Sequence, residues 1–332
     1  MSGVLLADLV ETADRVAATR SRTTKVAAMA DLFRRAGPAQ AAIVAGLLSG
    51  APRQGRIGVG WATVLRLEVE PAASPSLTLD DLDATLDDVA ATAGEGSTGA
   101  RTARLVDPLG RATPAEADFL RRLLLGELRH GALAALVGEA LAAAAGVAVA
   151  EVRRVAMLRG DLAAVAAIAL AEGSSGLAAI GLEVLRPVQP MLAAPAKDVA
   201  DALVATGTAS VEWKLDGARV QVHRAGDEVR VFTRSFRDVT ARLPGVAAVA
   251  RSLPGGRFVL DGEVLGLSGD ERPERFQDTM SRFGAQGDGA GSTLAVRFFD
   301  LRPDWLASKD GLGAPAWVGS PCRTLDVPLV PA

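Results

Sequence analysis

One lysine of this sequence stands in a setting that suits a nucleophile. Residues 214–219 read Lys-Leu-Asp-Gly-Ala-Arg, the pattern Lys-x-Asp-Gly-x-Arg, and Lys214 is one of only four lysines among the 36 basic residues of the 332-residue chain. A chain whose basic residues are almost all arginine is expected to keep lysine mainly where a guanidinium cannot replace the amine. The clearest such case is an amine that must lose its proton and attack an electrophile.

The neighbourhood of Lys214 predicts how the amine is presented. A neutral lysine amine costs about 4 to 5 kcal/mol at pH 7, and Arg219, Arg234 or a bound metal ion would lower that cost. The apolar run before Lys214 and the alternation in residues 220–224 predict a strand, a tight turn and a second strand. The turn would hold the amine at a sheet edge, and Gly217 would let a phosphate approach the backbone.

Further chemistry-bearing residues lie on later segments with a strand pattern. Residues 220–235 predict a hairpin that ends at Arg234. Glu263 lies inside the apolar segment 257–265, where an unpaired carboxylate would be costly to bury, so it needs a partner. The segment 294–301 is another predicted strand. It contains two phenylalanines followed by an aspartate.

These segments resemble a known family. Residues 214–219 in their strand context resemble motif I of the nucleotidyltransferases that form a covalent lysine-AMP or lysine-GMP intermediate. Residues 257–265 resemble motif III, residues 294–301 resemble motif IIIa, and Thr233-Arg234-Ser235 resembles a Ser-Arg segment of the same family. Residues 123–133, within a helical region, resemble the helix and loop of a ligase DNA-binding domain, which narrows the resemblance to ATP-dependent DNA ligases.

The resemblance implies a site and its ligands. Lys214 would be the nucleophile, and ATP and Mg²⁺ the cofactors. The other implied site residues are Glu212 at the adenine edge, Arg219 beside the nucleotide, Arg234 on the sugar or phosphate of the nick, Glu263 at the ribose and the metal, and Phe299 stacked on the adenine. Each residue also has a plain structural interpretation. Lys214 could be a solvated lysine in a hairpin turn, Glu212 an exposed carboxylate on a strand, and Glu263 a residue on the polar face of a half-buried strand. Arg234 could be a surface residue at a strand end, and Phe299 could be part of the core.

The first part of the chain reads as helices. Thr23 or Thr24 is expected to cap a helix that runs through Arg35, and Pro38 to open another through Leu48.

Several later features belong to the same helical region. Thr78 is expected to cap an acidic helix, and residues 113–116 form a capping box with proline at the first helical position. Two more helices are expected at about 131–145 and 148–171. The glycine-rich run 94–99 follows a helix instead of a strand, so it predicts a loop and not a dinucleotide site.

The helical region is the expected DNA-binding part. Arginines gather in residues 15–35 and 121–159, which could track phosphates or simply form solvated helix faces. By resemblance the domain grips nicked double-stranded DNA across the minor groove, with Arg129 as a contact candidate. His130 is interpreted as a packing or surface residue.

The expected architecture has three parts. Residues 1–185 would form an all-α DNA-binding domain, residues 186–301 an incomplete α+β nucleotidyltransferase (adenylation) domain with antiparallel sheets, and residues 302–332 an irregular tail. Residues 187–193, with two prolines, are expected to form an edge strand at the domain boundary, and residues 198–205 a short helix.

Composition limits the class of protein. The single Cys322 and the absence of a long apolar run or a basic N-terminal leader predict a cytoplasmic protein without a disulfide or transmembrane helix. The net charge of −3 is not typical of a simple nucleic-acid binder. The resemblance implies a monomer. After residue 301 no segment resembles motifs IV to VI, so we expect a truncated or frame-shifted end and weak nick sealing by this chain alone.

Alternative interpretations remain open at this point. An RNA ligase or capping guanylyltransferase shares motifs I, III and IIIa, although the long helical region before motif I favours a DNA ligase. A DNA-binding remnant without catalysis is the non-enzyme alternative. The resemblance implies a role in DNA replication, repair or recombination.

Overall fold

The chain folds into two compact units, Met1–Ile180 and Gly181–Ala332. The computed structural model describes residues 3–327 apart from 56, 58, 60–66, 68, 129–133, 191–194, 208–214, 269–271, 273, 285–293 and 303–324. The sequence analysis placed the division at 185/186. Each unit has its own hydrophobic core, and the two cores share no residue.

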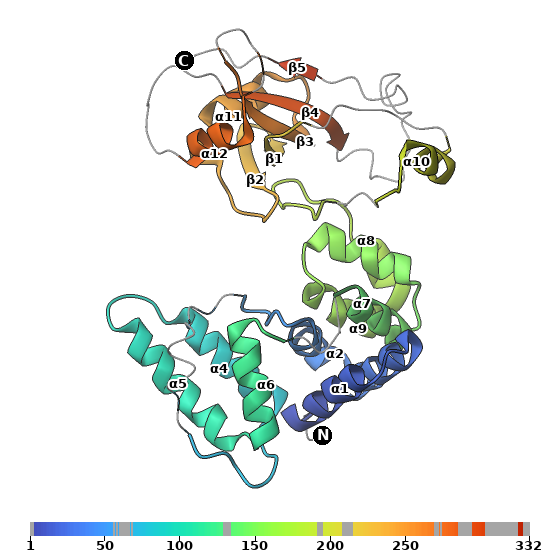
Figure 1. Cartoon of the computed structure of the whole chain (residues 1–332), viewed down its shortest axis with the longest axis vertical. Coiled ribbons are helices and arrows are strands. Elements are labelled where there is room, and N and C mark those ends of the chain that lie inside the picture. The colour runs from blue at the N-terminus through green and yellow to red at the C-terminus, as the bar shows by residue number, and fades with distance from the viewer. Residues whose placement is uncertain are drawn as a thin grey trace. The chain divides into compact units, whose positions relative to one another are not determined.

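The first unit is helical in its described residues (Figure 1). Its helices are α1 (Leu6–Ala18), α2 (Arg22–Ser49), α4 (Leu79–Ala91), α5 (Ser97–Arg111), α6 (Pro114–Leu125), α7 (Ala134–Ala145), α8 (Val149–Arg159) and α9 (Ala163–Ala179). The long helix α2 packs against α1, α7 and α9 and carries the fully buried Phe33. An all-α first domain is therefore confirmed.

The two helices expected around residue 38 are joined. Ser21, not Thr23 or Thr24, caps α2, because the Ser21 hydroxyl accepts a hydrogen bond from Thr24 N. Gly37 has φ +63°, which breaks the helical path just before Pro38. The predicted interruption is thus present as a kink, and the predicted cap was wrong by two or three positions.

Glycines explain two other differences from the sequence analysis. The single helix expected at 148–171 is two helices, because Gly160 ends α8 in the left-handed conformation (φ +74°) and its N–H bonds Ala156 O. The expected loop at 94–99 is correct only through Gly96, since α5 begins at Ser97.

Two predicted helix starts are confirmed. The Thr78 side chain accepts from Asp81 N at the start of α4. At the start of α6, Thr113 and Glu116 form the predicted reciprocal capping box, with Pro114 as the first helical residue.

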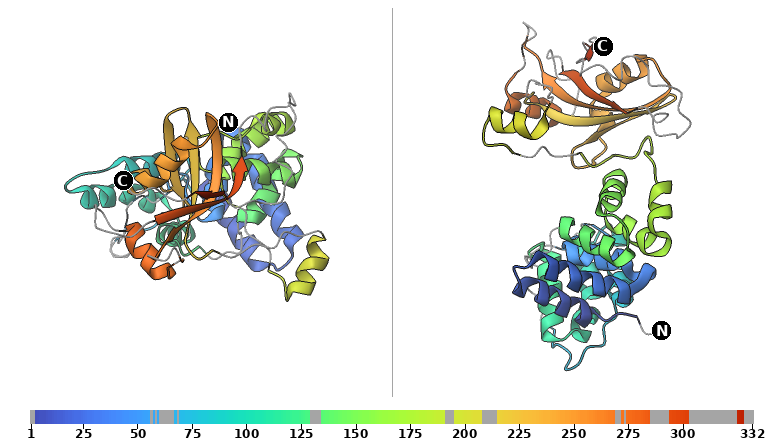
Figure 2. Two further views of the ribbon diagram at one scale, coloured as in Figure 1. Left: turned by 90° about the horizontal axis from the view of Figure 1, so that it is seen from above. Right: turned by 90° about the vertical axis from the view of Figure 1, so that its right-hand side faces the viewer.

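The second unit is built on an antiparallel sheet (Figure 2). The order of its strands is β2-β1-β3-β4-β5. Its strands are β1 (Ala218–Ala225), β2 (Glu228–Thr233), β3 (Arg257–Gly266), β4 (Leu294–Arg302) and β5 (Leu325–Val327). Short helices accompany them: α10 (Val199–Thr206), the 3₁₀ turn η1 (Thr240–Arg242), α11 (Pro244–Ser252) and α12 (Phe276–Gly284). The predicted α+β domain, the hairpin and the strands at 257–265 and 294–301 are confirmed.

The two faces of the sheet differ in chemistry. On one face Val220, Val222 and Leu260 join α11 in the core of this unit. Because side chains alternate along a strand, Arg219 and residues 221 and 223 point to the opposite face. That opposite face carries Arg219 and Glu263, two of the predicted site residues.

The segment that leads into this unit is not the strand expected at 187–193. Residues 187–190 have no strand structure, and residues 191–194 lie outside the described part of the chain. Val188 bonds the side chain of Gln221 instead of a neighbouring strand, because proline on both sides leaves few backbone donors for a ladder. The expected short helix is present as α10, with Asp198 as its N-cap.

Candidate active site

Charged residues form a row across the second face of the sheet. Arg219 on β1 lies directly opposite Glu263 on β3, and Glu263 lies directly opposite Arg297 on β4. Directly opposed residues of antiparallel strands project from the same face, with their Cβ atoms about 5 Å apart. Two predicted site residues, Arg219 and Glu263, are therefore brought together by strand register alone.

Glu263 has the partner that its apolar strand requires. Its Oε1 accepts a hydrogen bond from the backbone N–H of Gly217 at 3.2 Å. This bond joins the Lys-x-Asp-Gly-x-Arg segment to β3. The carboxylate is half-buried, so the bond compensates part of the cost of removing it from water.

Gly217 is required for a reason other than the one expected. A Cβ atom at this position would lie 2.3 Å from Val264 O and 2.6 Å from Leu265 Cδ2. The backbone of β3 itself therefore occupies the space beside Gly217. The expectation that this glycine makes room for a phosphate is replaced by close packing of two protein segments.

Asp261 is a site residue that the sequence analysis missed. Its two oxygens accept from Arg219 Nε at 3.1 Å and Arg219 Nη2 at 2.7 Å, which is a two-point ion pair that fixes the plane of the guanidinium. Asp261 and Glu263 are two residues apart on β3, so the alternation of the strand could have placed both on one face. The two-point contact of Asp261 with Arg219 depends on side-chain geometry that no sequence pattern contains.

Phe299 occupies a special position in the backbone. Asp261 pairs with Asp300 and Gly262 pairs with Phe298, so Phe299 is the extra residue of a β-bulge. Bulges are common beside active sites, where they change the direction of a side chain. Gly262 is needed here because a Cβ atom would lie 2.6 Å from Arg297 O. The Phe299 side chain is not among the described parts of the structure.

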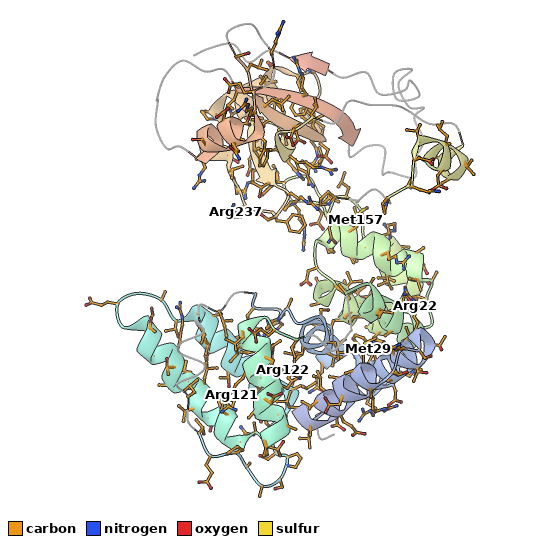
Figure 3. All side chains as sticks on the ribbon, viewed as in Figure 1. Arg22, Met29, Arg121, Arg122, Met157 and Arg237 are labelled. Atoms are coloured by element: carbon orange, nitrogen blue, oxygen red, sulfur yellow. The ribbon has the colours of Figure 1, made fainter. Side chains whose placement is uncertain are left out.

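Arg234 lies in the tight turn after β2 and is exposed. Thr233 N donates to Arg237 O at 3.0 Å, and Phe236 has the left-handed φ of +63°. Thr233 pairs with Val220, so this turn begins at the end of β1 that carries Arg219. Figure 3 shows Arg237 on the same turn.

Lys214, Glu212, Arg129 and His130 lie outside the residues that the structure describes.

Gln221 and His223 are buried polar residues on the same face as Arg219. His223 is 0% exposed and Gln221 is 6% exposed. Burial lowers the pKa of His223 to about 4, so the imidazole is neutral at pH 7. The alternation of His223 with Arg219 along β1 was the available sign in the sequence that His223 faces the site.

Metal binding is compatible with part of this face. Within the described ranges, no cluster of three or more His, Cys, Asp or Glu side chains could enclose an ion. Mg²⁺ is often bound by one or two carboxylates together with substrate phosphates and water. Glu263 fits that role as one ligand, whereas both oxygens of Asp261 are bound to Arg219.

Some arginines of the first unit form ion pairs with Asp or Glu side chains. Arg22 and Arg153 both bond Glu139, and Arg35 pairs with Asp8. Figure 3 shows Arg22 on α2, and Arg121 and Arg122 on α6. None of the helices in the described residues is both long enough and hydrophobic enough to cross a bilayer.

Two family patterns match this chain. The pattern described as "DNA ligase N terminus" matches residues 62–142, and the pattern described as "ATP dependent DNA ligase domain" matches residues 190–302. Both describe parts of DNA ligases, one in each compact unit. The chain belongs to the ATP-dependent DNA ligase family.

Individual relatives agree with the patterns. A "Probable DNA ligase" of Pseudarthrobacter chlorophenolicus is 52% identical over 299 residues, which are 90% of this chain and 59% of that protein. A "Probable DNA ligase" of an Anaeromyxobacter species is 51% identical over 318 residues, or 94% of this chain and 61% of that protein. The chain thus spans about three fifths of the length of these relatives.

A solved structure shares the fold. The structure named "Pmar-Lig_Pre." matches with a TM-score of 0.53 and 16% identity, over 89% of this chain and 57% of that one.

Proposed function

We propose that this protein carries out the first step of ATP-dependent DNA ligation at Lys214. The neutral amine of Lys214 attacks the α-phosphorus of ATP. A nitrogen–phosphorus bond forms, the bond between the α-phosphorus and the bridging oxygen breaks, pyrophosphate leaves, and the amine proton passes to solvent. The product is a covalent lysine-AMP.

The observation that carries this proposal is the contact between the Lys214 segment and Glu263. Gly217 N donates to Glu263 Oε1, and Arg219 lies opposite Glu263 in register. Lys214 and Gly217 belong to the same six-residue motif, Lys-x-Asp-Gly-x-Arg. The contact therefore links the motif that contains the proposed nucleophile to this carboxylate and this guanidinium.

Each proposed role follows from the chemistry of the side chain. Arg219, oriented by Asp261, supplies a fixed positive charge to the nucleotide, and its charge also favours the neutral form of a nearby amine. Glu263 accepts a ribose hydroxyl or binds the metal. A bound Mg²⁺ ion would neutralise negative charge that develops on the phosphates. Glu212 and Phe299 would contact the adenine.

The later steps are proposed for the full-length protein. AMP would pass to the 5′-phosphate of a nick, and the 3′-hydroxyl would displace it. All these steps are phosphoryl transfers, which depend mainly on positioning and electrostatic stabilisation. The helical unit, which carries the N-terminal ligase pattern, would hold the nicked duplex, with Arg234 near the nick. Replication, repair or recombination would each supply such nicks.

Labelling with radioactive nucleotide tests the function. The protein is incubated with α-labelled ATP or GTP and separated by denaturing electrophoresis. We expect label from ATP in the wild type and in Lys197→Ala, a matched control, and none in Lys214→Ala.

The other outcomes of this experiment have definite meanings. Label from GTP would contradict the proposal and favour a capping enzyme. An unlabelled wild type that still binds DNA in a salt-sensitive manner would contradict it and favour a DNA-binding remnant.

A further inference from the structure

Two buried polar side chains on β1 bind residues 185–188, near the start of the second unit. Leu185 N donates to His223 Nδ1 at 3.1 Å, and Val188 N donates to Gln221 Oε1 at 2.9 Å. The Gln221 amide Nε2 donates in return to Val188 O. The backbone N–H and C=O of Val188 are thus both paired with the side-chain amide of Gln221. This amide makes the two hydrogen bonds that a neighbouring strand would otherwise make.

The hydrogen bonds define the protonation of the ring. Because Nδ1 accepts from Leu185, the proton of the neutral imidazole is on Nε2. Nε2 faces Gln221 Oε1 at 3.4 Å, so the two side chains support each other. The ring is also held from the β2 side by Phe232, edge to face, with centroids 5.1 Å apart. Its position is therefore set by contacts on several sides.

The cost of this arrangement indicates a specific role. Buried polar groups are costly unless they are fully paired, and apolar residues of similar size would fill the same space without that risk. Leu185 also adopts the left-handed φ of +74°, which is unusual for a leucine. The bond to His223 stabilises this strained residue, so the pair fixes one particular path of the backbone.

The bound segment lies next to the candidate nucleotide site. Gln221 follows Arg219 on the same face of β1 and lies directly opposite Asp261. The segment that covers Gln221 therefore borders the Arg219–Asp261 ion pair.

We propose that Gln221 and His223 are positioning residues that fasten residues 185–188 across the sheet as a wall of the nucleotide site. This inference rests on the proposed function, because it assumes that the site binds ATP.

Variants of the two residues test the proposal. His223→Leu and Gln221→Met remove the hydrogen bonds and keep much of the volume, whereas His223→Asn keeps an acceptor near the position of Nδ1. ATP affinity is measured by calorimetry in a Lys214→Ala background, so that no covalent product forms. Hydrogen exchange of the Leu185 and Val188 amides reports whether the segment is released.

We expect His223→Leu and Gln221→Met to speed exchange of these amides at least tenfold and to weaken ATP binding several-fold. His223→Asn should stay close to the parent in both measurements, which also controls for loss of folding. Unchanged ATP affinity with a released segment would overturn the proposal, as would unchanged amide exchange. Failure of the proposed function is seen separately, as an unlabelled wild type in the labelling experiment, and a parent that binds no ATP would contradict both.

Discussion

Arg219 depends on Asp261 for its orientation, because the two-point ion pair leaves its guanidinium in one plane. Asp261→Asn should slow formation of the lysine-AMP product roughly tenfold, since a hydrogen bond between charged groups contributes more than a neutral one. Rates of ATP labelling in the wild type and the variant measure this effect. Glu228→Gln, which disturbs the exposed pair Arg230–Glu228 on β2 of the same sheet, is the matched control and should leave the rate unchanged.

Gly217 is a second residue whose substitution should have a definite effect, in this case on stability. Gly217→Ala would place a methyl group 2.3 Å from Val264 O, so β1 and β3 must move apart. We expect the free energy of unfolding to fall by about 1 to 3 kcal/mol in urea titrations. Gly256→Ala, at a position with open space around it, should change it by less than about 0.5 kcal/mol. Equal effects at the two glycines would show that the close approach is tolerated.

His223 gives the protein a defined response to acid. Its pKa is about 4 in the folded state and about 6.5 in an unfolded chain. Between these values the unfolded state binds more protons, so the free energy of unfolding should fall as pH drops from 6.5 to 4, by on the order of 3 kcal/mol in total. Urea titrations at several pH values measure the slope, and His223→Asn should have a flatter one. Identical slopes would contradict a buried neutral imidazole.

Some site residues could be predicted from the sequence and others could not. Glu263 was predictable because a carboxylate in an apolar strand needs a partner, but the partner, Gly217 N–H, follows only from the pairing of β1 with β3. Asp261, Gln221 and His223 share a face with Arg219 through simple alternation. Their contacts depend on strand register and on the path of a distant segment, which local patterns do not contain.

At the scale of elements, the helix caps at Thr78 and Thr113 were predicted from the sequence, whereas the cap of α2 was not. Thr113 and Glu116 form the expected capping box. In one of its two hydrogen bonds, Thr113 N donates to Glu116 Oε2 at 2.7 Å. Thr113→Ala should destabilise the first unit by about 1 to 2 kcal/mol in thermal or urea unfolding, because α6 loses its cap and the buried Glu116 loses a donor. Thr102→Ala, the same change inside α5, should have little effect. An unchanged stability of the Thr113→Ala variant would mean that water replaces the capping hydrogen bonds at no cost.

Element boundaries were less predictable than element types. The stretch 148–171 is divided into α8 and α9 at Gly160, whose left-handed conformation ends α8, and at Asp161, whose side chain accepts from Ala163 N at the start of α9. The prolines of residues 187–190 suggested an edge strand. The side chain of Gln221 makes the hydrogen bonds that a neighbouring strand would have made. Because Gln221 is distant in the sequence, these hydrogen bonds depend on the tertiary structure.

At the scale of the whole molecule, the order of a helical unit followed by an antiparallel sheet was predicted and is confirmed. Separate cores in the two units agree with the two family patterns, one in each unit. The chain spans about three fifths of its relatives' length, so nick sealing is a property to test in full-length proteins, whereas lysine adenylation can be tested here.

The most direct test is to locate the adenylate within the protein. The wild type is incubated with ATP and Mg²⁺ and digested, and the modified peptide is sequenced by mass spectrometry. We predict that AMP is found on Lys214 and that Lys214→Arg carries none. AMP on Lys197 or Lys309, or no modified peptide at all, would contradict the claim that this lysine is the nucleophile.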